Sequence, residues 1–182
     1  DGVIDLRPLR EFKSVEDSKQ CSRDLFISAK AISNRAKALI SIQDLGGDFG
    51  FGDCDEIRLF SGGVVGVARS AAVEWPQAHV KAIDIARGNQ DAAHLAERIC
   101  MELLYGGPEL DVGLPLSGLR TTLRLETVNA IAVDLPFGSE DTIVVSGGAR
   151  GVTADCVIAL ANKSKAHFFL FGQTELLADP CQ

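Results

Sequence analysis

The chain alternates between short apolar runs and longer stretches in which apolar residues recur every three or four positions. The first pattern predicts buried strands, and the second predicts amphipathic helices that cover them. Strands are expected at residues 38–43, 79–85, 110–114, 118–126, 142–145 and 167–171, with an edge-like segment at 1–9. Helices are expected at residues 22–35, 61–75, 91–105 and 153–161. Because strands alternate with helices, the sequence predicts an α/β fold with a largely parallel sheet.

A polar, turn-rich stretch at residues 134–141 interrupts this alternation, and a second α/β unit begins at about Thr142. We therefore expect a boundary between residues 130 and 140. One domain would cover residues 1–135 and the other residues 141–182. The expected fold class is a Rossmann-like parallel sheet followed by the first βαβ unit of a second Rossmann-like domain.

The composition argues against several classes of function. The 182 residues carry a formal net charge of −7, and no block of basic residues favours nucleic acid. No apolar run approaches the roughly 18 residues that a membrane-spanning helix needs. The five cysteines and three histidines are scattered, so we expect reduced thiols, a cytoplasmic protein and no metal site. The chain begins at Asp1 without a signal-peptide pattern, and we expect it to be a piece of a longer protein.

The segment with the most specific chemistry is Thr142-Ile-Val-Val-Ser-Gly-Gly-Ala-Arg-Gly-Val-Thr153. A strand, a glycine-rich turn, a helix and a second strand follow one another, as in a dinucleotide-binding βαβ unit. Backbone N–H groups and the helix dipole attract a pyrophosphate there, and glycines permit its close approach. The residues expected to bind the cofactor are Ser146, Gly147, Gly148, Ala149, Arg150, Gly151, Val152, Gly172, Gln173 and Thr174. The alternative is that the glycines only shape a connection between a strand and a helix.

The end of the second strand in such a unit usually selects between NAD and NADP. An acidic residue there binds the ribose hydroxyls of NAD, whereas an arginine accepts the extra phosphate of NADP. This chain has Gly172-Gln173-Thr174, and the missing acid argues against an NAD-dependent single-domain dehydrogenase. Arg150 in the turn can supply the positive charge that NADP needs; the alternative is an ordinary solvated loop residue.

Two segments resemble the ketoreductase domains of modular polyketide synthases, most closely those of polyunsaturated-fatty-acid synthases, in the short-chain dehydrogenase/reductase superfamily. The first is the cofactor turn, Val145-Ser-Gly-Gly-Ala-Arg-Gly-Val-Thr153. The second is Gly66-Val-Ala-Arg-Ser-Ala-Ala-Val-Glu-Trp-Pro76, followed by Ala82-Ile-Asp84. It resembles a hallmark of the truncated, cofactor-free structural subdomain that precedes the catalytic subdomain in this family. The strand and glycine-rich loop at residues 40–50 are similar to that subdomain as well.

The resemblance implies that residues 1–135 form the structural subdomain and that residues 141–182 begin an NADPH-binding catalytic subdomain. It also implies a reaction for the intact protein, in which NADPH reduces a β-ketoacyl group. That group would be tethered through phosphopantetheine to an acyl carrier protein, beside neighbouring synthase domains. The family's second strand tends to end in Gly-Arg-Ser, so Gln173 is a departure from its pattern.

Reductases of this superfamily use a tyrosine as general acid, a lysine four residues later and a serine that holds the carbonyl oxygen. The only tyrosine, Tyr105, precedes the cofactor turn and has Glu109 four residues after it. We therefore assign no catalytic residue, expect the piece itself to be inactive, and expect Tyr105 to pack on the sheet at a helix end. The alternative function is a degenerate, non-catalytic structural domain within a large synthase, which Gln173 motivates.

Overall fold

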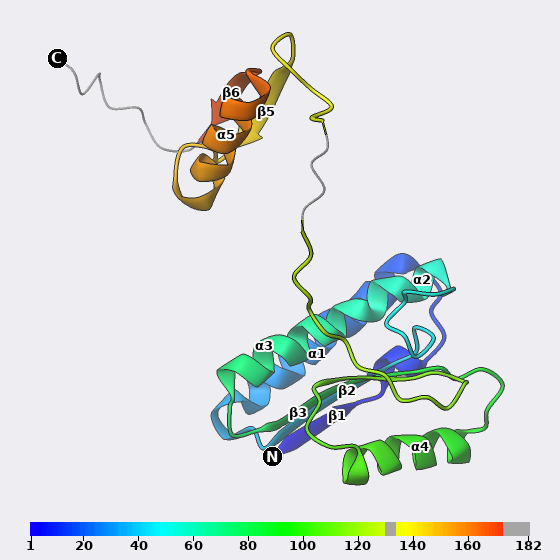
Figure 1. The fold of residues 1–182 in the computed structure, drawn as a ribbon. Coiled ribbons are helices and arrows are strands. Elements are labelled where there is room, and N and C mark those ends of the chain that lie inside the picture. The colour runs from blue at the N-terminus through cyan, green and yellow to red at the C-terminus, as the bar shows by residue number, and fades with distance from the viewer. Residues whose placement is uncertain (130–133, 173–182) are drawn as a thin grey trace. The chain divides into compact units, whose positions relative to one another are not determined.

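A computed structural model describes residues 1–129 and 134–172 of the chain (Figure 1). The chain divides into two compact units, Asp1–Glu126 and Thr127–Gln182, here called unit 1 and unit 2. Each unit has its own parallel sheet, so the predicted α/β class is confirmed. Among the described residues, no helix has the length and apolar character needed to cross a membrane.

Unit 1 is a four-stranded parallel sheet in the order β1-β2-β3-β4. The strands are β1 (Gly2–Asp5), β2 (Ala38–Gln43), β3 (His79–Ile85) and β4 (Asp111–Leu114). Helices α1 (Val15–Ile32) and α3 (Gly63–Glu74) lie on one face of the sheet, and α4 (Ala92–Tyr105) lies on the other (Figure 1). The short helix α2 (Glu56–Leu59) and single 3-10 turns at Arg7–Leu9, Ser33–Arg35 and Phe60–Gly62 complete the unit. The result is a three-layer, Rossmann-like arrangement.

Strand β2 shows why this sheet needs helices on both faces. Its side chains alternate, so Leu39 joins the core beneath α1 and α3 while Ile40 and Ile42 join the core beneath α4. Both faces of the strand are therefore apolar, which is the pattern of a buried parallel strand. The sequence predicted β2 and β3 with the bounds that the structure has.

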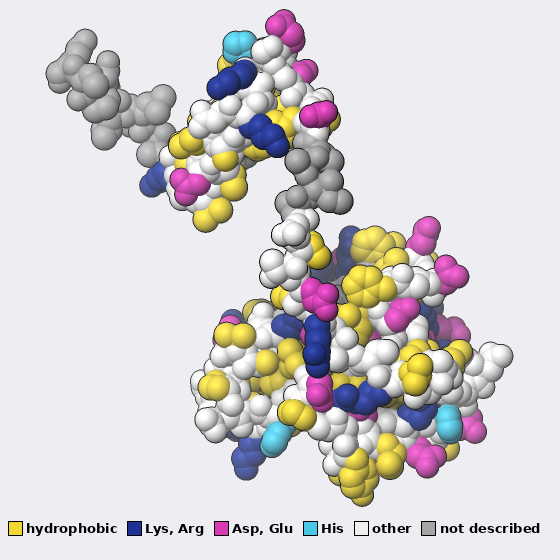
Figure 2. Space-filling view, in the orientation of Figure 1, with side chains coloured by type: hydrophobic (Ala, Val, Ile, Leu, Met, Phe, Trp, Pro, Cys, Tyr) yellow, Lys and Arg dark blue, Asp and Glu magenta, His cyan; other side chains and the backbone are white. Residues whose placement is uncertain are grey.

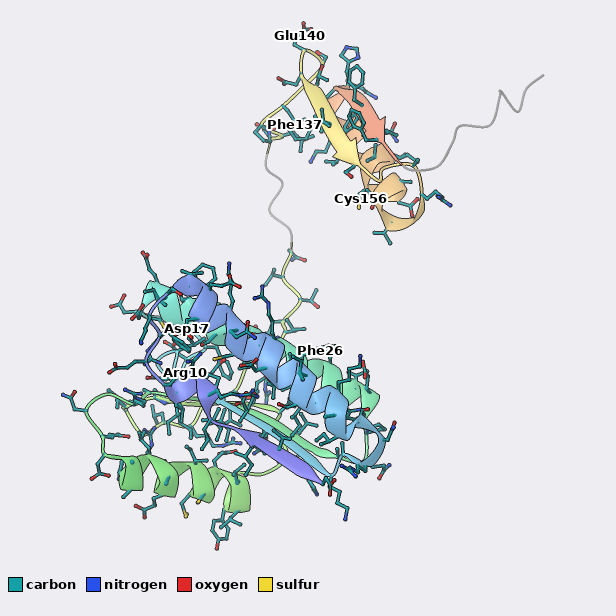
Figure 3. All side chains as sticks on the ribbon, turned by 180° about the vertical axis from the view of Figure 1, so that it is seen from behind. Arg10, Asp17, Phe26, Phe137, Glu140 and Cys156 are labelled. Atoms are coloured by element: carbon teal, nitrogen blue, oxygen red, sulfur yellow. The ribbon has the colours of Figure 1, made fainter. Side chains whose placement is uncertain are left out.

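The first helix begins earlier than expected. It starts at Val15 rather than at residue 22, because Ser14 caps it by accepting a hydrogen bond from the Asp17 N–H at 3.2 Å. Arg10 forms an ion pair with Asp17 at 2.6 Å, which holds the preceding segment against this first turn. Both residues are labelled in Figure 3. The polar residues of this turn hide the helical periodicity from the sequence pattern.

The prediction of a strand at residues 118–126 is wrong. Only Thr121 forms a bridge, to Gly113, and the rest of the segment is irregular. Its course is set instead by Arg120, which donates to the Glu102 carboxylate at 2.7 Å. Glu102 is 5% exposed and also pairs with Lys81 at 2.5 Å. This buried cluster ties β3, α4 and the segment after β4 together.

Unit 2 consists of β5 (Thr142–Ser146), α5 (Gly151–Ser164) and β6 (His167–Phe171). The strands pair in parallel, which confirms the predicted βαβ unit, although the helix extends beyond the expected residues 153–161 at both ends. On the sheet, Val144, Phe169 and Phe171 are 67%, 61% and 60% exposed. Figure 2 shows hydrophobic side chains on the surface of this unit. Its two strands therefore bury little apolar area.

Candidate functional site

The glycine-rich turn of unit 2 lies at the carboxyl ends of two adjacent parallel strands. Ser146 at the end of β5 is in register with Phe171 at the end of β6. The Gly147 N–H donates to the Phe171 carbonyl oxygen at 2.6 Å, which fixes the start of the turn to the neighbouring strand. In α/β folds, ligands bind outside the carboxyl ends of the strands. The structure thus brings the predicted residues 146–152 and Gly172 to one end of the sheet.

The three glycines of the turn are required for different reasons. Gly147 and Gly151 have φ angles of +77° and +59°, in the left-handed region that glycine adopts without strain. Gly148 is buried, and a Cβ atom there would lie 2.9 Å from Leu170 Cδ2 and 3.0 Å from Val145 Cγ1. The first two shape the turn and leave its outer side open, whereas Gly148 allows the turn to pack on the strands.

The electrostatics of the turn favour an anion. Helix α5 has 14 residues and no acidic residue in its first turn. Arg150 occupies the N-cap position with an extended backbone, and its side chain forms no capping hydrogen bond. The helix dipole therefore faces a glycine turn without a capping carboxylate, the arrangement that binds phosphate groups. Ser146, Ala149 and Val152 are exposed around it, whereas Gln173 and Thr174 lie outside the described residues.

Unit 1 contains a second glycine-rich segment, the loop at residues 45–52 after β2. It differs from the turn of unit 2 in the hydrogen bonds of its backbone. Several of its backbone N–H groups already have acceptors within the chain. The buried Asp84 at the end of β3 accepts from the Leu45 N–H at 2.6 Å and from the Phe49 N–H at 2.7 Å. The sequence pattern does not reveal this role of Asp84, because a buried acceptor is recognised only from its partners. The Ala82-Ile-Asp84 motif marked the residue only as part of a family resemblance and assigned it no role.

The Asp84 carboxyl is expected to titrate well above the usual aspartate range. Burial, with a smaller contribution from the nearby Asp44 charge, outweighs the N–H groups that donate to the carboxylate and raises its pKa to about 6. Because the pKa in the folded state lies above the pKa in the unfolded state, the folded state binds the proton more readily at any pH between these two values. The contribution of Asp84 to stability therefore falls as the pH rises from about 4 to about 6.

A carbon-13 NMR titration of the chain checks this expectation, with Asp84→Asn used to assign the resonance. A midpoint near 6 is expected. A midpoint in the ordinary range, about 4, would show that the hydrogen bonds outweigh burial.

The single tyrosine of the chain lies in unit 1, whereas the glycine turn lies in unit 2. Tyr105 lies at the end of α4 in unit 1 and is 75% exposed, so the expectation that it packs on the sheet is wrong. Its exposure follows from its place on the outer face of the helix, away from the apolar stripe that contains Ile99. Within residues 1–129 and 134–172, no three His, Cys, Asp or Glu side chains are grouped to hold a metal ion. Cys21, Cys54, Cys100 and Cys156 are free thiols.

Comparison with known proteins gives a relative in sequence and a relative in structure. No protein-family model matches the chain. Over 147 residues the chain is 26% identical to a polyunsaturated fatty acid synthase protein of Thraustochytrium sp., a match that covers 76% of this chain and 5% of that protein. The fold is similar, with a TM-score of 0.61 and 19% identity, to a structure that contains adenylation, ketoreductase and pseudo Asub domains of a keto acid-selecting NRPS module. That match covers 96% of this chain and 16% of the other, so the chain spans a small part of both proteins.

Proposed function

We propose that the chain is part of a ketoreductase domain of a polyketide or polyunsaturated-fatty-acid synthase. Unit 2 begins the NADPH-binding subdomain, and unit 1 is the structural subdomain that precedes it. The observation that carries this proposal is the open glycine turn at the N-terminus of α5, between two parallel strands. The similarity to a polyunsaturated fatty acid synthase and to a structure that contains a ketoreductase supports the same assignment.

The turn fits the pyrophosphate of a dinucleotide. The first N–H groups of a helix have no acceptor within the helix itself and can bind an anion. Nothing lies within 4 Å of the position of a Cβ atom at Gly147 or Gly151, so no side chain blocks the approach there. Arg150, with Gly172, Gln173 and Thr174 at the end of β6, would surround the adenosine ribose. Arg150 is the cation in this set, and it replaces the arginine that the resembled family carries where this chain has Gln173.

In the intact protein, the reaction proposed is the reduction of a β-ketoacyl group carried by an acyl carrier protein. Bound NADPH supplies a hydride to the ketone carbon, and a general acid delivers a proton to the oxygen, which gives a β-hydroxyacyl thioester. Residues 1–182 contain no Tyr-x-x-x-Lys sequence, so in this proposal the general acid comes from another part of the synthase. The piece by itself binds cofactor and does not reduce substrate. A cytoplasmic location and contacts with neighbouring synthase domains belong to the same proposal.

The proposal is tested by titrating the nitrogen-15-labelled chain with NADPH and following its amide resonances. We expect shifts at residues 146–152 and at the end of β6, and weaker shifts with NADH, because NADH lacks the phosphate that Arg150 would contact. Unchanged resonances at the turn in millimolar NADPH would overturn the assignment. Shifts confined to the loop at residues 45–52 would place the nucleotide in unit 1 instead.

A non-catalytic structural domain is the second candidate, and Gln173 in place of an arginine is the observation that favours it. The two candidates differ in cofactor affinity. Micromolar binding of NADPH by the complete domain would argue against a structural spacer, since a spacer has no need to retain the turn's affinity.

A further inference from the structure

The loop at residues 45–52 in unit 1 encloses two carboxylates of its own chain. Asp84 accepts from the N–H groups of Leu45 and Phe49, one on each oxygen. Asp48, within the loop, accepts from the N–H groups of Gly50 and Gly52, both at 3.0 Å. Four backbone donors of a short loop thus converge on two negatively charged groups. These contacts lie wholly within unit 1 and do not depend on the cofactor turn.

The backbone of this loop has the shape that binds anions. Gly46, Gly47 and Gly50 have φ angles of +94°, +79° and +77°, and Phe49 also adopts a positive φ, of 62°. These left-handed residues fold the loop back on itself, so that the N–H groups of Leu45 and Phe49, four positions apart, both reach the Asp84 carboxylate and form a concave nest that favours negative charge. A phenylalanine in this region is strained, and such strain persists where the surroundings hold the backbone in place.

Packing fixes the loop at the carboxyl ends of the strands. A Cβ atom on Gly47 would lie 2.5 Å from the backbone of Leu114 and Pro115 at the end of β4. Asp84 reaches the loop from the end of β3 and is fully buried. The nest is therefore preformed at the edge of the sheet where α/β folds place their ligands.

We propose that the loop at residues 45–52 is an oxyanion-binding site whose occupant is the chain's own Asp84 carboxylate. The site takes a single carboxylate: the N–H groups of Leu45 and Phe49 bind one oxygen each, as they would bind those of a free carboxylate. Truncating Asp84 to alanine removes three heavy atoms, a carbon and two oxygens. Formate consists of the same three heavy atoms and restores the lost acceptor without a covalent bond to β3.

The test is chemical rescue of Asp84→Ala in the 182-residue chain at a pH near 8, where formate and Asp84 are ionised. Trp75 is the only tryptophan and packs against the core beneath α1 and α3, so its fluorescence follows the melting of unit 1. At about 0.2 M, sodium formate is expected to raise the melting temperature of the variant by about 4 °C more than sodium chloride does. The unsubstituted protein should respond equally to the two salts, because its site is filled.

Val112→Ala is the matched control. Val112 is fully buried in the same sheet, so its truncation also removes buried atoms, but from an apolar side chain. Sodium formate should therefore not raise the melting temperature of this variant more than sodium chloride does. Equal responses of Asp84→Ala to formate and chloride would overturn the proposal.

The unsubstituted chain gives a second measurement in case Asp84→Ala does not fold in either salt. The amide protons of Leu45 and Phe49 should then shift with pH at the same midpoint as the Asp84 carboxyl. Amide shifts that do not follow that titration would overturn the proposal as well.

Discussion

Replacement of Glu102 by alanine is expected to lower the free energy of unfolding of unit 1 by about 3 to 5 kcal/mol. The reason is the buried Lys81, whose Nζ lies 2.5 Å from Glu102 Oε1 and 2.9 Å from the Gly107 carbonyl oxygen. Lys81 is 8% exposed, so without the carboxylate its charge would stay buried and unpaired. Arg120, which Glu102 also binds, would lose its anchor on α4. Denaturant unfolding followed by Trp75 fluorescence measures the loss.

Two variants separate the buried charge from simple loss of packing. Glu97→Ala, on the same helix but exposed and outside the ion pairs of the described residues, should change stability by less than about 0.5 kcal/mol. The double variant Lys81→Met with Glu102→Leu should recover part of the loss, because the lysine charge is then gone. A loss below about 1 kcal/mol for Glu102→Ala would contradict this account.

The effect of Glu102→Ala should depend on pH. Burial acts to raise the pKa of Glu102, but hydrogen bonds from Arg120 and Lys81 outweigh it and lower the pKa below the ordinary value. The stabilisation is therefore fully present above the unfolded glutamate pKa and is lost as the pH falls through the folded pKa. The difference between the two proteins should accordingly shrink in acid.

Replacement of Gly151 by valine is expected to weaken NADPH binding at least tenfold, or by about 1.4 kcal/mol or more. Gly151 has a φ angle of +59° at the first residue of α5, and nothing lies within 4 Å of the position of a Cβ atom there. A valine would not collide with the protein. Instead it would disfavour the left-handed backbone and place methyl groups on the open side of the turn, where the pyrophosphate is proposed to bind. Titration of the labelled chain with NADPH gives the dissociation constants.

Gly138→Val is the matched control for this substitution. Gly138 precedes β5, whereas the turn follows it, and a Cβ atom at Gly138 would also meet nothing within 4 Å. This variant should bind NADPH as the unsubstituted chain does. If both valines weakened binding equally, the effect would come from general destabilisation of unit 2 and not from the turn. Gly151→Ala should give an intermediate loss, since its single methyl group blocks less of the approach.

The sequence predicted the strands of this fold better than its irregular segments, for a physical reason. Strands β2, β3 and β6 are compact runs that are apolar on both faces or bounded by turns. The bounds of each run in the sequence therefore agree with the bounds of the strand in the structure. Residues 118–126 also contain alternating apolar residues, but Arg120 is drawn to a buried carboxylate that lies 18 positions earlier in the chain. A partner at that separation leaves no periodic signal.

The candidate site shows the same contrast. The turn at residues 146–152 was predictable, because its glycines, its helix start and its strands are neighbours in the sequence. The role of Asp84 was not, because its carboxylate oxygens serve a loop 35 to 39 residues earlier. A site whose residues are neighbours in the sequence can be predicted from the sequence. The hydrogen-bond partners of a buried carboxylate are known only when the structure shows which strands and loops lie side by side.

The strand order β1-β2-β3-β4 in unit 1 follows the order of the chain. Each strand after the first therefore pairs with an edge formed by the strand made just before it. During synthesis on the ribosome, every newly emerged helix and strand can be added to a sheet that already exists. We expect nascent chains released just after β3 to hold a three-stranded sheet already, so that unit 1 grows strand by strand at one edge.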